Sequence, residues 1–255
     1  MINLSKKLIR QVAQANAKFG LIKENDKVLL GLSGGKDSLA LAHLLQRMSK
    51  HAPFNFEFEA ITLSYGMGED YSKLHAHCEE HGINHKVLDS NIYELSGDTI
   101  RQNSSFCSYF SRMRRGALYT YALENGFNKL AIAHHLDDAA ESFFMNFIYN
   151  GALRTLAPIY KSKRGVVVIR PLIFVRERQL RDNALMNELE VIGNEFCPGM
   201  KLSEKNVKFP HAREEAKQLL SKLEKDNPKL FTSLKTAFSN LHQESFWEEK
   251  KSAKK

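Results

Sequence analysis

The chain contains 255 residues, of which 43% are hydrophobic and 26% are charged, and its formal net charge is +8. This length suits one or two domains with a substantial core, and the composition excludes a disordered, collagen-like or low-complexity protein. No run of 18 apolar residues and no apolar secretory segment is present, so we expect no membrane association. The three cysteines are too few for a disulfide framework, which favours the cytoplasm.

Hydrophobic periodicity and the positions of glycine predict strands that alternate with helices. The predicted strands cover residues 27–32, 56–64, 84–90, 129–135 and 166–172. The predicted helices cover residues 3–19, a segment ending at Lys50, 69–81, 112–125, a segment ending at Asn150, 176–190, and two later stretches divided near Pro228. This alternation predicts an α/β fold with a parallel sheet and right-handed crossovers, in which ligands bind at the carboxyl ends of the strands.

The positive charge is concentrated in two internal segments. Residues 99–123 contain four Arg and no acidic residue, and residues 153–181 contain eight Lys or Arg and one Glu. Together these segments carry +11, which exceeds the net charge of +8, so the rest of the chain is slightly acidic. We expect an anion-binding surface, most simply for a nucleic acid; the alternative is a solvated face without a partner.

A glycine-rich segment, Ser33-Gly34-Gly35-Lys36-Asp37-Ser38, follows the first predicted strand. Two glycines allow a tight turn that exposes backbone N–H groups to an anion, and the hydroxyl and ammonium groups add further donors. The following helix directs its positive end at the same place. The segment is not a Walker A loop, because Leu30 stands where that pattern needs Gly and Asp37 where it needs Ser or Thr. It predicts a phosphate site; the alternative is a plain turn capped by Asp37 or Ser38.

This segment resembles the pyrophosphate-binding loop of the N-type ATP pyrophosphatases, the PP-loop superfamily, whose members use ATP to adenylate a substrate oxygen. The resemblance implies a Rossmann-like, adenine-nucleotide alpha-hydrolase-like domain that binds ATP and Mg²⁺, with Asp37 as a catalytic residue and a Mg²⁺ ligand. The residues expected at the nucleotide are Ser33, Gly34, Gly35, Lys36, Asp37, Ser38, Leu63, Ser64 and His134. We divide the chain into an N-terminal helix (1–20), an ATP-binding catalytic domain (21–175), a helical C-terminal region (176–246) and a basic tail (247–255).

A second polar segment, HHLDD at residues 134–138, ends the fourth predicted strand. Its spacing fits either a carboxylate pair that holds Mg²⁺ or a helix cap made by Asp138 and Glu141. Zinc binding by His134 and His135 is disfavoured, since adjacent residues on a strand point to opposite faces. The segment resembles the second motif of lysidine synthetase and of the tRNA 2-thiocytidine synthases. That resemblance implies that Asp137 and Asp138 lie in the active site, with Asp138 as a further candidate Mg²⁺ ligand and the two histidines nearby.

A third segment points to one branch of the superfamily. Residues 107–116 read CSYFSRMRRG, which is similar to C-S-x-C-S-R-x-R-R-G of the tRNA 2-thiocytidine synthases. The similarity continues through residues 170–172 and Cys197-Pro198 and covers nearly the whole chain. Lysidine synthetases carry additional C-terminal domains and archaeal-type thiolases add zinc-finger cysteines, neither of which is expected here. The resemblance implies thiolation of cytidine in tRNA, with Arg114 in the catalytic site.

The third segment departs from the family at a chemically important position. In the thiocytidine synthases, two of its cysteines and one from a later Cys-x-x-Cys pair hold a [4Fe–4S] cluster. Cys107 and Cys197 match two of these ligands, whereas Phe110 and Met200 stand where family cysteines are expected. Three interpretations stay open: Cys78 completes a cluster, Cys107 and Cys197 act as persulfide carrier and resolving thiol, or sulfur chemistry has been lost. A buried structural role is the alternative for Cys78, and inert thiols are the alternative for the other two.

The sequence therefore predicts an ATP-dependent tRNA-modifying enzyme that adenylates a base, most specifically at cytidine C2, and replaces oxygen with sulfur. Its expected partners are tRNA and a sulfur donor such as a cysteine desulfurase, and a homodimer is compatible with this interpretation. Two alternatives remain: an adenylating ligase or amidase of the lysidine-synthetase type, and a protein that binds ATP and RNA but has lost sulfur transfer.

Overall fold

The computed structural model describes residues 2–99, 106–192 and 211–245. Its described strands form one six-stranded sheet in the order β3-β2-β1-β4-β6-β5. The strands are β1 (Asp26–Gly31), β2 (Phe56–Leu63), β3 (His85–Leu88), β4 (Lys129–Ala131), β5 (Ile159–Lys161) and β6 (Val167–Ile169). Since β2 and β4 lie on opposite sides of β1, the chain leaves β1 at the point where the strand order reverses, which is where open α/β sheets bind their ligands.

The prediction of an α/β fold is confirmed, with one correction to the sheet. The pairs β1–β2, β2–β3, β1–β4 and β4–β6 are parallel, as predicted. The strand β5 was not predicted, and it pairs antiparallel with β6 at the sheet edge. It has only three residues and is half-buried to exposed, so it lacks the long apolar run that identifies a central parallel strand.

The helices follow the predicted order, with shifted ends. They are α1 (Lys6–Phe19), α2 (Lys36–His51), α3 (Ser72–Glu80), α4 (Ile92–Thr99), α5 (Phe106–Glu124), α6 (Leu136–Asn150), α7 (Glu177–Met186), α9 (His211–Asp226), α10 (Leu230–Ala237) and the 3₁₀ helix η1 (Gln243–Ser245). The first helix begins at Lys6 rather than at residue 3, because the Ser5 hydroxyl caps it by accepting from the Leu8 N–H at 3.2 Å. Helix α4 was not predicted, α5 starts six residues before the predicted 112, and α7 ends at Met186 rather than at residue 190.

The start of α3 was also predicted too early, at residue 69 instead of Ser72. Glu69 does not join the helix. Its carboxylate accepts from the Tyr65 N–H at 2.7 Å and from the Met67 N–H at 2.9 Å, and so closes the turn that leaves β2. These hydrogen bonds lower the pKa of Glu69 against the opposing effect of burial, which is the largest influence. The residue therefore shapes the carboxyl edge of the sheet.

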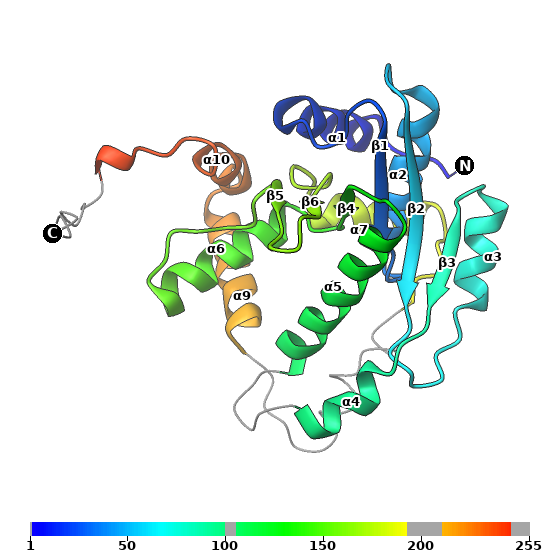
Figure 1. Ribbon diagram of the computed structural model, residues 1–255. Helices are drawn as coiled ribbons and strands as arrows, with labels where there is room; N and C mark the ends of the chain where they lie inside the picture. The colour runs from blue at the N-terminus through cyan, green and yellow to red at the C-terminus, as the bar shows by residue number, and fades with distance from the viewer. Residues whose placement is uncertain (1, 100–105, 193–210, 246–255) are drawn as a thin grey trace, which may run out of the picture.

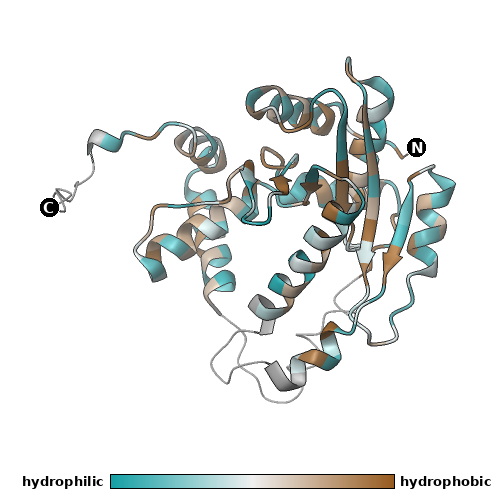
Figure 2. Cartoon of the chain, in the orientation of Figure 1, coloured by the Kyte–Doolittle hydropathy of each residue, from teal (hydrophilic) through white to brown (hydrophobic). Residues whose placement is uncertain are grey.

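The sheet is buried on both faces. On β1, Val28 and Leu30 pack into one core with α1, α2 and α7, whereas Leu29 packs on the other face with Leu118 and Ala122 of α5. This alternation is the two-residue period of a strand covered on both sides. Figure 2 shows hydrophobic segments along the central strands β1 and β2, whereas α3 is largely hydrophilic.

Helices α9 and α10 lie beside α6, away from β1–β3 (Figure 1). Leu136 and Ala140 of α6 form a small separate core with Leu220 of α9 and Phe231 of α10. The C-terminal helices are thereby packed against the helix that follows β4. Within the described residues, no helix combines the length and apolarity that crossing a bilayer would require.

Candidate active site

The loop from β1 to α2 presents a helix N-terminus with no side-chain cap. Gly35 is the N-cap residue, in an extended conformation (φ −70°, ψ 157°), and the first N–H groups of α2 have no intrahelical acceptor. The Ser38 hydroxyl donates to the Gly35 carbonyl at 2.9 Å and accepts from the Ser33 N–H at 3.2 Å. The alternative of a turn capped by Asp37 or Ser38 is therefore wrong, and the loop geometry suits an anion.

Gly34 occupies a position that only glycine fits. Its φ is +79°, and a Cβ there would lie 2.5 Å from Cδ1 and 2.9 Å from Cβ of Ile192. The Ile192 N–H donates to the Gly34 carbonyl at 3.1 Å. The segment after α7 is thus seated directly on the loop, and a side chain at position 34 would displace it.

Asp37 is the acidic group at the centre of the loop. One of its oxygens, Oδ1, is buried with no hydrogen-bond partner in the described part of the chain, while Oδ2 lies 3.2 Å from Lys36 Nζ. Burial raises the pKa of Asp37 in spite of the nearby cations. The same Lys36 ammonium lies 3.2 Å from Oε1 of Glu177. A buried carboxylate oxygen without a partner suits a hard cation such as Mg²⁺, which prefers oxygen ligands.

The two predicted motifs meet at His135. This residue caps α6: its ring nitrogen Nδ1 accepts from the backbone N–H of Asp138 at 3.3 Å, and its backbone N–H donates to Asp138 Oδ2 at 2.9 Å. The alternative of a helix cap made by Asp138 and Glu141 is therefore wrong, because the cap lies about one turn earlier and is made by His135 and Asp138. Since Nδ1 accepts, the neutral ring carries its proton on Nε2, which lies 3.9 Å from Asp37 Oδ2. The parallel pairing of β1 with β4 brings together these residues, which are far apart in sequence.

Asp137 is held almost completely by protein groups. Its oxygens accept from Arg176 Nε at 3.1 and 3.2 Å and from the Glu177 N–H at 2.7 Å. The same guanidinium donates to Glu224 of α9 at 2.8 and 2.9 Å and lies over the ring of Phe231. The segment before α7 thus joins the second motif to both C-terminal helices.

Asp138 is paired with Arg213 of α9, whose guanidinium also donates from Nε to Glu141 Oε2 at 2.8 Å. Burial raises the pKa of Glu141, and the neighbouring Arg213 opposes that rise. Arg213 and Glu224 were missed in the sequence, because nothing in their local pattern reveals a partner more than forty residues away. Of the three aspartates, Asp37 is the one with a buried oxygen left unpaired.

His134 lies between β4, which ends at Ala131 rather than at the predicted residue 135, and α6. Its Nδ1 accepts from Arg170 Nε at 3.2 Å, and burial lowers the pKa of His134 to about 4. The two neighbouring histidines thus have different hydrogen-bond partners. Arg170 itself is 5% exposed and stacks on Tyr160.

The cations of the second basic segment, residues 153–181, fall into a buried group and an exposed group. Arg170 and Arg176 are engaged inside the protein, whereas the other six cations are exposed: Arg154, Lys161, Lys163, Arg164, Arg178 and Arg181. In the first segment, Arg112 and Arg115 are exposed on α5 and Arg114 is half-buried. Fewer cations are therefore available at the surface than the number of Lys and Arg residues in these segments suggests, but both segments keep exposed cations.

Phe110 is part of the hydrophobic core. It is 4% exposed and packs with Leu63 and Ile92. Its ring meets those of Tyr65 and Tyr109 edge to face, with centroids 5.9 and 5.4 Å apart. The side chain that stands at a family cysteine position is therefore an aromatic anchor between α5 and the end of β2.

One of the three cysteine side chains, that of Cys78, lies within the described residues. Cys78 is fully buried in the main core, and burial raises its pKa to about 11, which confirms the structural interpretation and argues against a role as a cluster ligand. Cys107 lies in the first turn of α5, but its side chain, with Cys197 and Met200, lies outside the described residues.

The remaining predicted nucleotide residues, Leu63 and Ser64, lie at the carboxyl end of β2. The Leu63 side chain packs into the cluster around Phe110, and the Ser64 hydroxyl donates to Glu69 Oε2 at 3.0 Å. Both lie at the same sheet edge as the loop. Their part in nucleotide binding stays a prediction.

Comparison with known proteins gives a consistent result. The family model of the PP-loop domain matches residues 4–195. A tRNA-cytidine(32) 2-sulfurtransferase from Citrifermentans bemidjiense is 37% identical over 234 residues, which are 91% of this chain and 89% of that protein. The enzyme of the same name from Yersinia enterocolitica is 36% identical over 93% of this chain and 74% of its own length.

A solved structure shares the fold as well. The U34-tRNA thiolase NcsA from Methanococcus maripaludis, determined with its [4Fe-4S] cluster, has a TM-score of 0.72 and 28% identity, covering 92% of this chain and 77% of that one. The predicted resemblance and fold class are both confirmed. The chain belongs to the PP-loop family and, within it, to the tRNA-cytidine(32) 2-sulfurtransferases.

Proposed function

We propose that this protein is a cytoplasmic, ATP-dependent tRNA sulfurtransferase that replaces the C2 oxygen of a cytidine with sulfur. The observation that carries the proposal is the meeting of the loop and the second motif, where His135 Nε2 lies 3.9 Å from Asp37 Oδ2 beside the open N-terminus of α2. A nucleotide bound at this edge lies within reach of both motifs. Membership of the sulfurtransferase family supports the same substrate class.

In the first step, the C2 oxygen of the base attacks the α-phosphorus of ATP, and pyrophosphate leaves. The N–H groups at the start of α2 and the Lys36 ammonium hold the β- and γ-phosphates. Lys36 reaches them by leaving Asp37 and Glu177, both of which it contacts at 3.2 Å. The product is an adenylated base whose oxygen is now a good leaving group.

The three aspartates take different parts in this step. Asp37, with its unpaired buried oxygen, is the residue that would hold Mg²⁺; when bound, the ion would supply charge neutralisation for the departing pyrophosphate. Asp138 is paired with Arg213 and Asp137 with Arg176, so these two fix the second motif in place. We therefore rank Asp37 first as the catalytic carboxylate.

The residues present do not fit a [4Fe–4S] cluster. A cubane is held by three or four thiolates, whereas Phe110 is a buried hydrocarbon and Cys78 is sealed in the core. The two remaining thiols of the chain, Cys107 and Cys197, offer only two ligands. No step of the proposed reaction is therefore assigned to a cluster.

Sulfur transfer instead uses these two thiols with a persulfide donor such as a cysteine desulfurase. The donor leaves a persulfide on Cys107, whose terminal sulfur attacks C2 and displaces AMP. The base is then joined to Cys107 through a disulfide. The Cys197 thiolate attacks the Cys107 sulfur, which releases the thiolated base and leaves a Cys107–Cys197 disulfide. A dithiol reductant regenerates the two thiols.

The exposed cations bind the tRNA backbone. Arg112 and Arg115 on α5 are exposed and lie on the same helix as Cys107, so RNA held there brings its base towards the thiol. Cations that contact phosphates make binding depend on salt. Changing Arg114 and Arg115 to Ala should weaken tRNA binding and flatten its salt dependence.

The decisive experiment measures AMP and pyrophosphate formation with tRNA for Asp37→Ala, with Asp182→Ala as the matched control. Asp182 is an exposed carboxylate on α7. We expect Asp37→Ala to reduce AMP formation by about 100-fold or more while tRNA affinity stays within about twofold. Loss of tRNA binding in Asp37→Ala would contradict the separation of nucleotide site and basic surface.

Cys107→Ser separates thiolation from the two alternative functions. We expect this variant to lose 2-thiocytidine, measured by mass spectrometry of tRNA nucleosides, while tRNA-dependent pyrophosphate release persists, because adenylation precedes the step that uses Cys107. AMP formation by the unchanged protein with no sulfur incorporated would indicate a ligase or amidase instead. No AMP formation with any tRNA would indicate a binding protein.

A further inference from the structure

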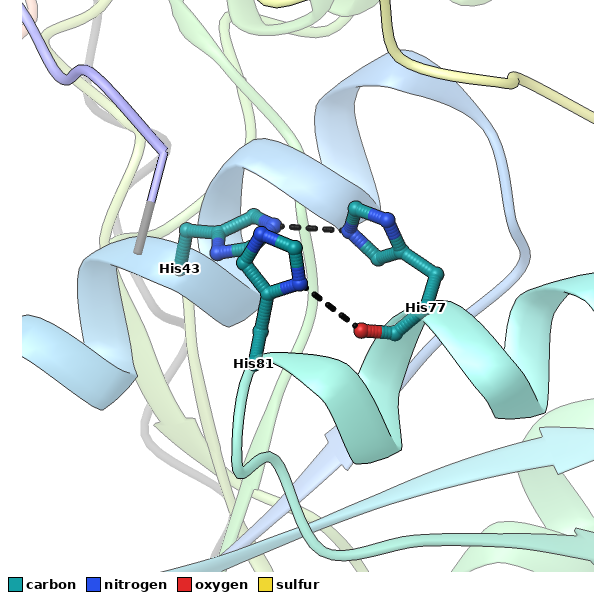
Figure 3. A group of neighbouring side chains, drawn as sticks. All are labelled: His43, His77 and His81. Atoms are coloured by element: carbon teal, nitrogen blue, oxygen red, sulfur yellow. Dashed lines mark hydrogen bonds between the residues drawn. The ribbon is translucent and has the colours of Figure 1, made fainter.

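Three histidines outside the ATP site converge between α2 and α3 (Figure 3). His43 lies on the buried face of α2, His77 in the last turn of α3, and His81 is the C-cap residue of α3. One ring nitrogen from each lies within 4.8 Å of the other two, and this is a cluster of potential metal ligands among the described residues. We propose that these three imidazoles bind one Zn²⁺ ion.

The hydrogen bonds of His81 prepare it as a ligand. Its Nδ1 lies 3.0 Å from the carbonyl oxygen of His77. A carbonyl can only accept, so Nδ1 carries the proton and the lone pair of Nε2 is free. A backbone carbonyl that fixes the tautomer in this way is the usual outer partner of a metal-binding histidine.

His43 is a buried polar residue whose ring packs edge-on against those of His77 and His81. It is 0% exposed, next to buried apolar neighbours on α2. Its Nε2 lies 2.9 Å from His77 Nε2, and its Nδ1 has no partner in the described part of the chain. In the metal-free chain, one of these two rings donates its proton to the other. A metal ion among the three rings replaces that single hydrogen bond with three metal–nitrogen bonds.

The chemistry of the cluster selects the type of ion. Metal binding requires neutral imidazoles, and burial of His43 disfavours its charged form. Donors that are all nitrogen suit Zn²⁺ rather than Mg²⁺, which prefers oxygen. Glu80 and Glu190 lie near His77 and favour positive charge there. The spacing of His77 and His81 places both on one face of α3.

The three rings are close enough for one ion but must shift to bind it, because their ligand nitrogens lie within 4.8 Å of one another and the rings of His77 and His81 are stacked. Zn–N bonds of about 2.0–2.1 Å in a tetrahedral site place ligand nitrogens about 3.3 Å apart, against 2.9 Å for the Nε2 pair. Three protein ligands leave the fourth position to water. The ion ties α3 to α2, the helix whose first turn forms the ATP loop. Its role is therefore to stabilise the nucleotide-binding half of the sheet.

The test uses the full chain with Cys107→Ser and Cys197→Ser, so that these thiolates cannot bind the ion. Chelator-treated protein is titrated with Zn²⁺ by calorimetry, and its melting temperature is measured with and without Zn²⁺. His77→Ala and His81→Ala are the test variants, because both side chains are half-buried, whereas that of His43 is fully buried. His75→Ala is the matched control, an exposed histidine on the same helix.

We expect one Zn²⁺ per chain and a rise in melting temperature of about 5–10 °C at a hundredfold excess over the Kd. Both test variants should lose this shift, and His75→Ala should keep it. His81→Ala should keep the metal-free melting temperature, whereas His77→Ala should lower it, because the buried His43 loses its hydrogen-bond partner. Bound Co²⁺ should show an absorption spectrum without thiolate charge-transfer bands. Equal Zn²⁺ stoichiometry and equal shifts in all four proteins, or no shift in any, would overturn the proposal.

Discussion

Arg176 holds the carboxylate of Asp137 from one side, with its Nε 3.1 Å from Oδ1 and 3.2 Å from Oδ2. The other edge of the same guanidinium binds both oxygens of Glu224 on α9. One half-buried cation thus neutralises two carboxylates from different parts of the chain. This arrangement fixes the start of α6, and with it His135, against the C-terminal helices.

Replacing Arg176 with Gln should lower the free energy of unfolding by about 3 kcal/mol, because two partly buried carboxylates lose their common cation. Arg178→Gln is the control: that guanidinium is exposed and lies 3.9 Å from Glu224, so its loss should cost less than about 0.5 kcal/mol. Urea denaturation measures both. Similar losses in the two variants would show that Glu224 needs only a nearby positive charge rather than this bidentate contact.

Gly34→Ala should weaken ATP binding at least about tenfold, since the new Cβ collides with Ile192 and shifts the phosphate loop. Gly68→Ala isolates the backbone effect: Gly68 has a similar φ of +78°, but a Cβ added there would meet no atom within 4 Å. That control should lose only about 1 kcal/mol of stability and keep its ATP affinity. Calorimetric titration with a non-hydrolysable ATP analogue tests both, and an unchanged affinity in Gly34→Ala would contradict the steric argument.

Phe110→Ala should destabilise the protein by about 3–5 kcal/mol, as expected when a buried aromatic ring leaves a cavity. Phe110→Leu retains much of the volume and should cost less than about 2 kcal/mol. Phe147→Ala, at a residue that is 54% exposed, is the control and should change stability by less than about 1 kcal/mol. These values come from urea unfolding. A small loss in Phe110→Ala would mean that the ring is not the anchor between α5 and β2.

The parts of the site that are contiguous in sequence could be predicted. The loop at residues 33–38 follows a buried strand, and the physical reasons for its glycines and cation are local. The second motif was found for the same reason, but its internal hydrogen bonds were assigned to the wrong residues. A histidine is a less familiar helix cap than aspartate, so the role of His135 was not expected.

The contacts that the sequence could not reveal join distant elements. Arg213 reaches Asp138 and Glu141 across the packing of α9 on α6. The histidine cluster has one visible signal, the spacing of His77 and His81, whereas His43 comes from another helix. Strand β5 depends on pairing with β6 more than on its own three residues. Tertiary packing decides each of these features.

Stability should fall as the pH drops below 6.5, and His85 offers the clearest test. The residue is 5% exposed, and burial lowers its pKa from 6.5 to about 4. The unfolded chain therefore binds a proton in this range that the folded protein does not, so the free energy of unfolding decreases between pH 6.5 and pH 4, by up to about 1.4 kcal/mol per pH unit for this group.

The substitution His85→Gln should remove that contribution while keeping the hydrogen bond to Thr62, although the 3.2 Å contact between Nδ1 of His85 and Nδ1 of His75 changes. Thr62 donates its hydroxyl to the Leu32 carbonyl at 2.9 Å and so accepts from His85 Nε2–H, also at 2.9 Å; the amide nitrogen of Gln can replace this donor but does not titrate. His51→Gln, at an exposed position, is the control. Urea unfolding between pH 7.5 and pH 4.5 should give a shallower pH dependence for His85→Gln alone, because its folded state no longer excludes a proton. Parallel curves for all three proteins would show that the pKa of His85 is the same in the folded and unfolded states. The loss of stability in acid would then have to come from other groups, such as His134, whose pKa is also lowered to about 4.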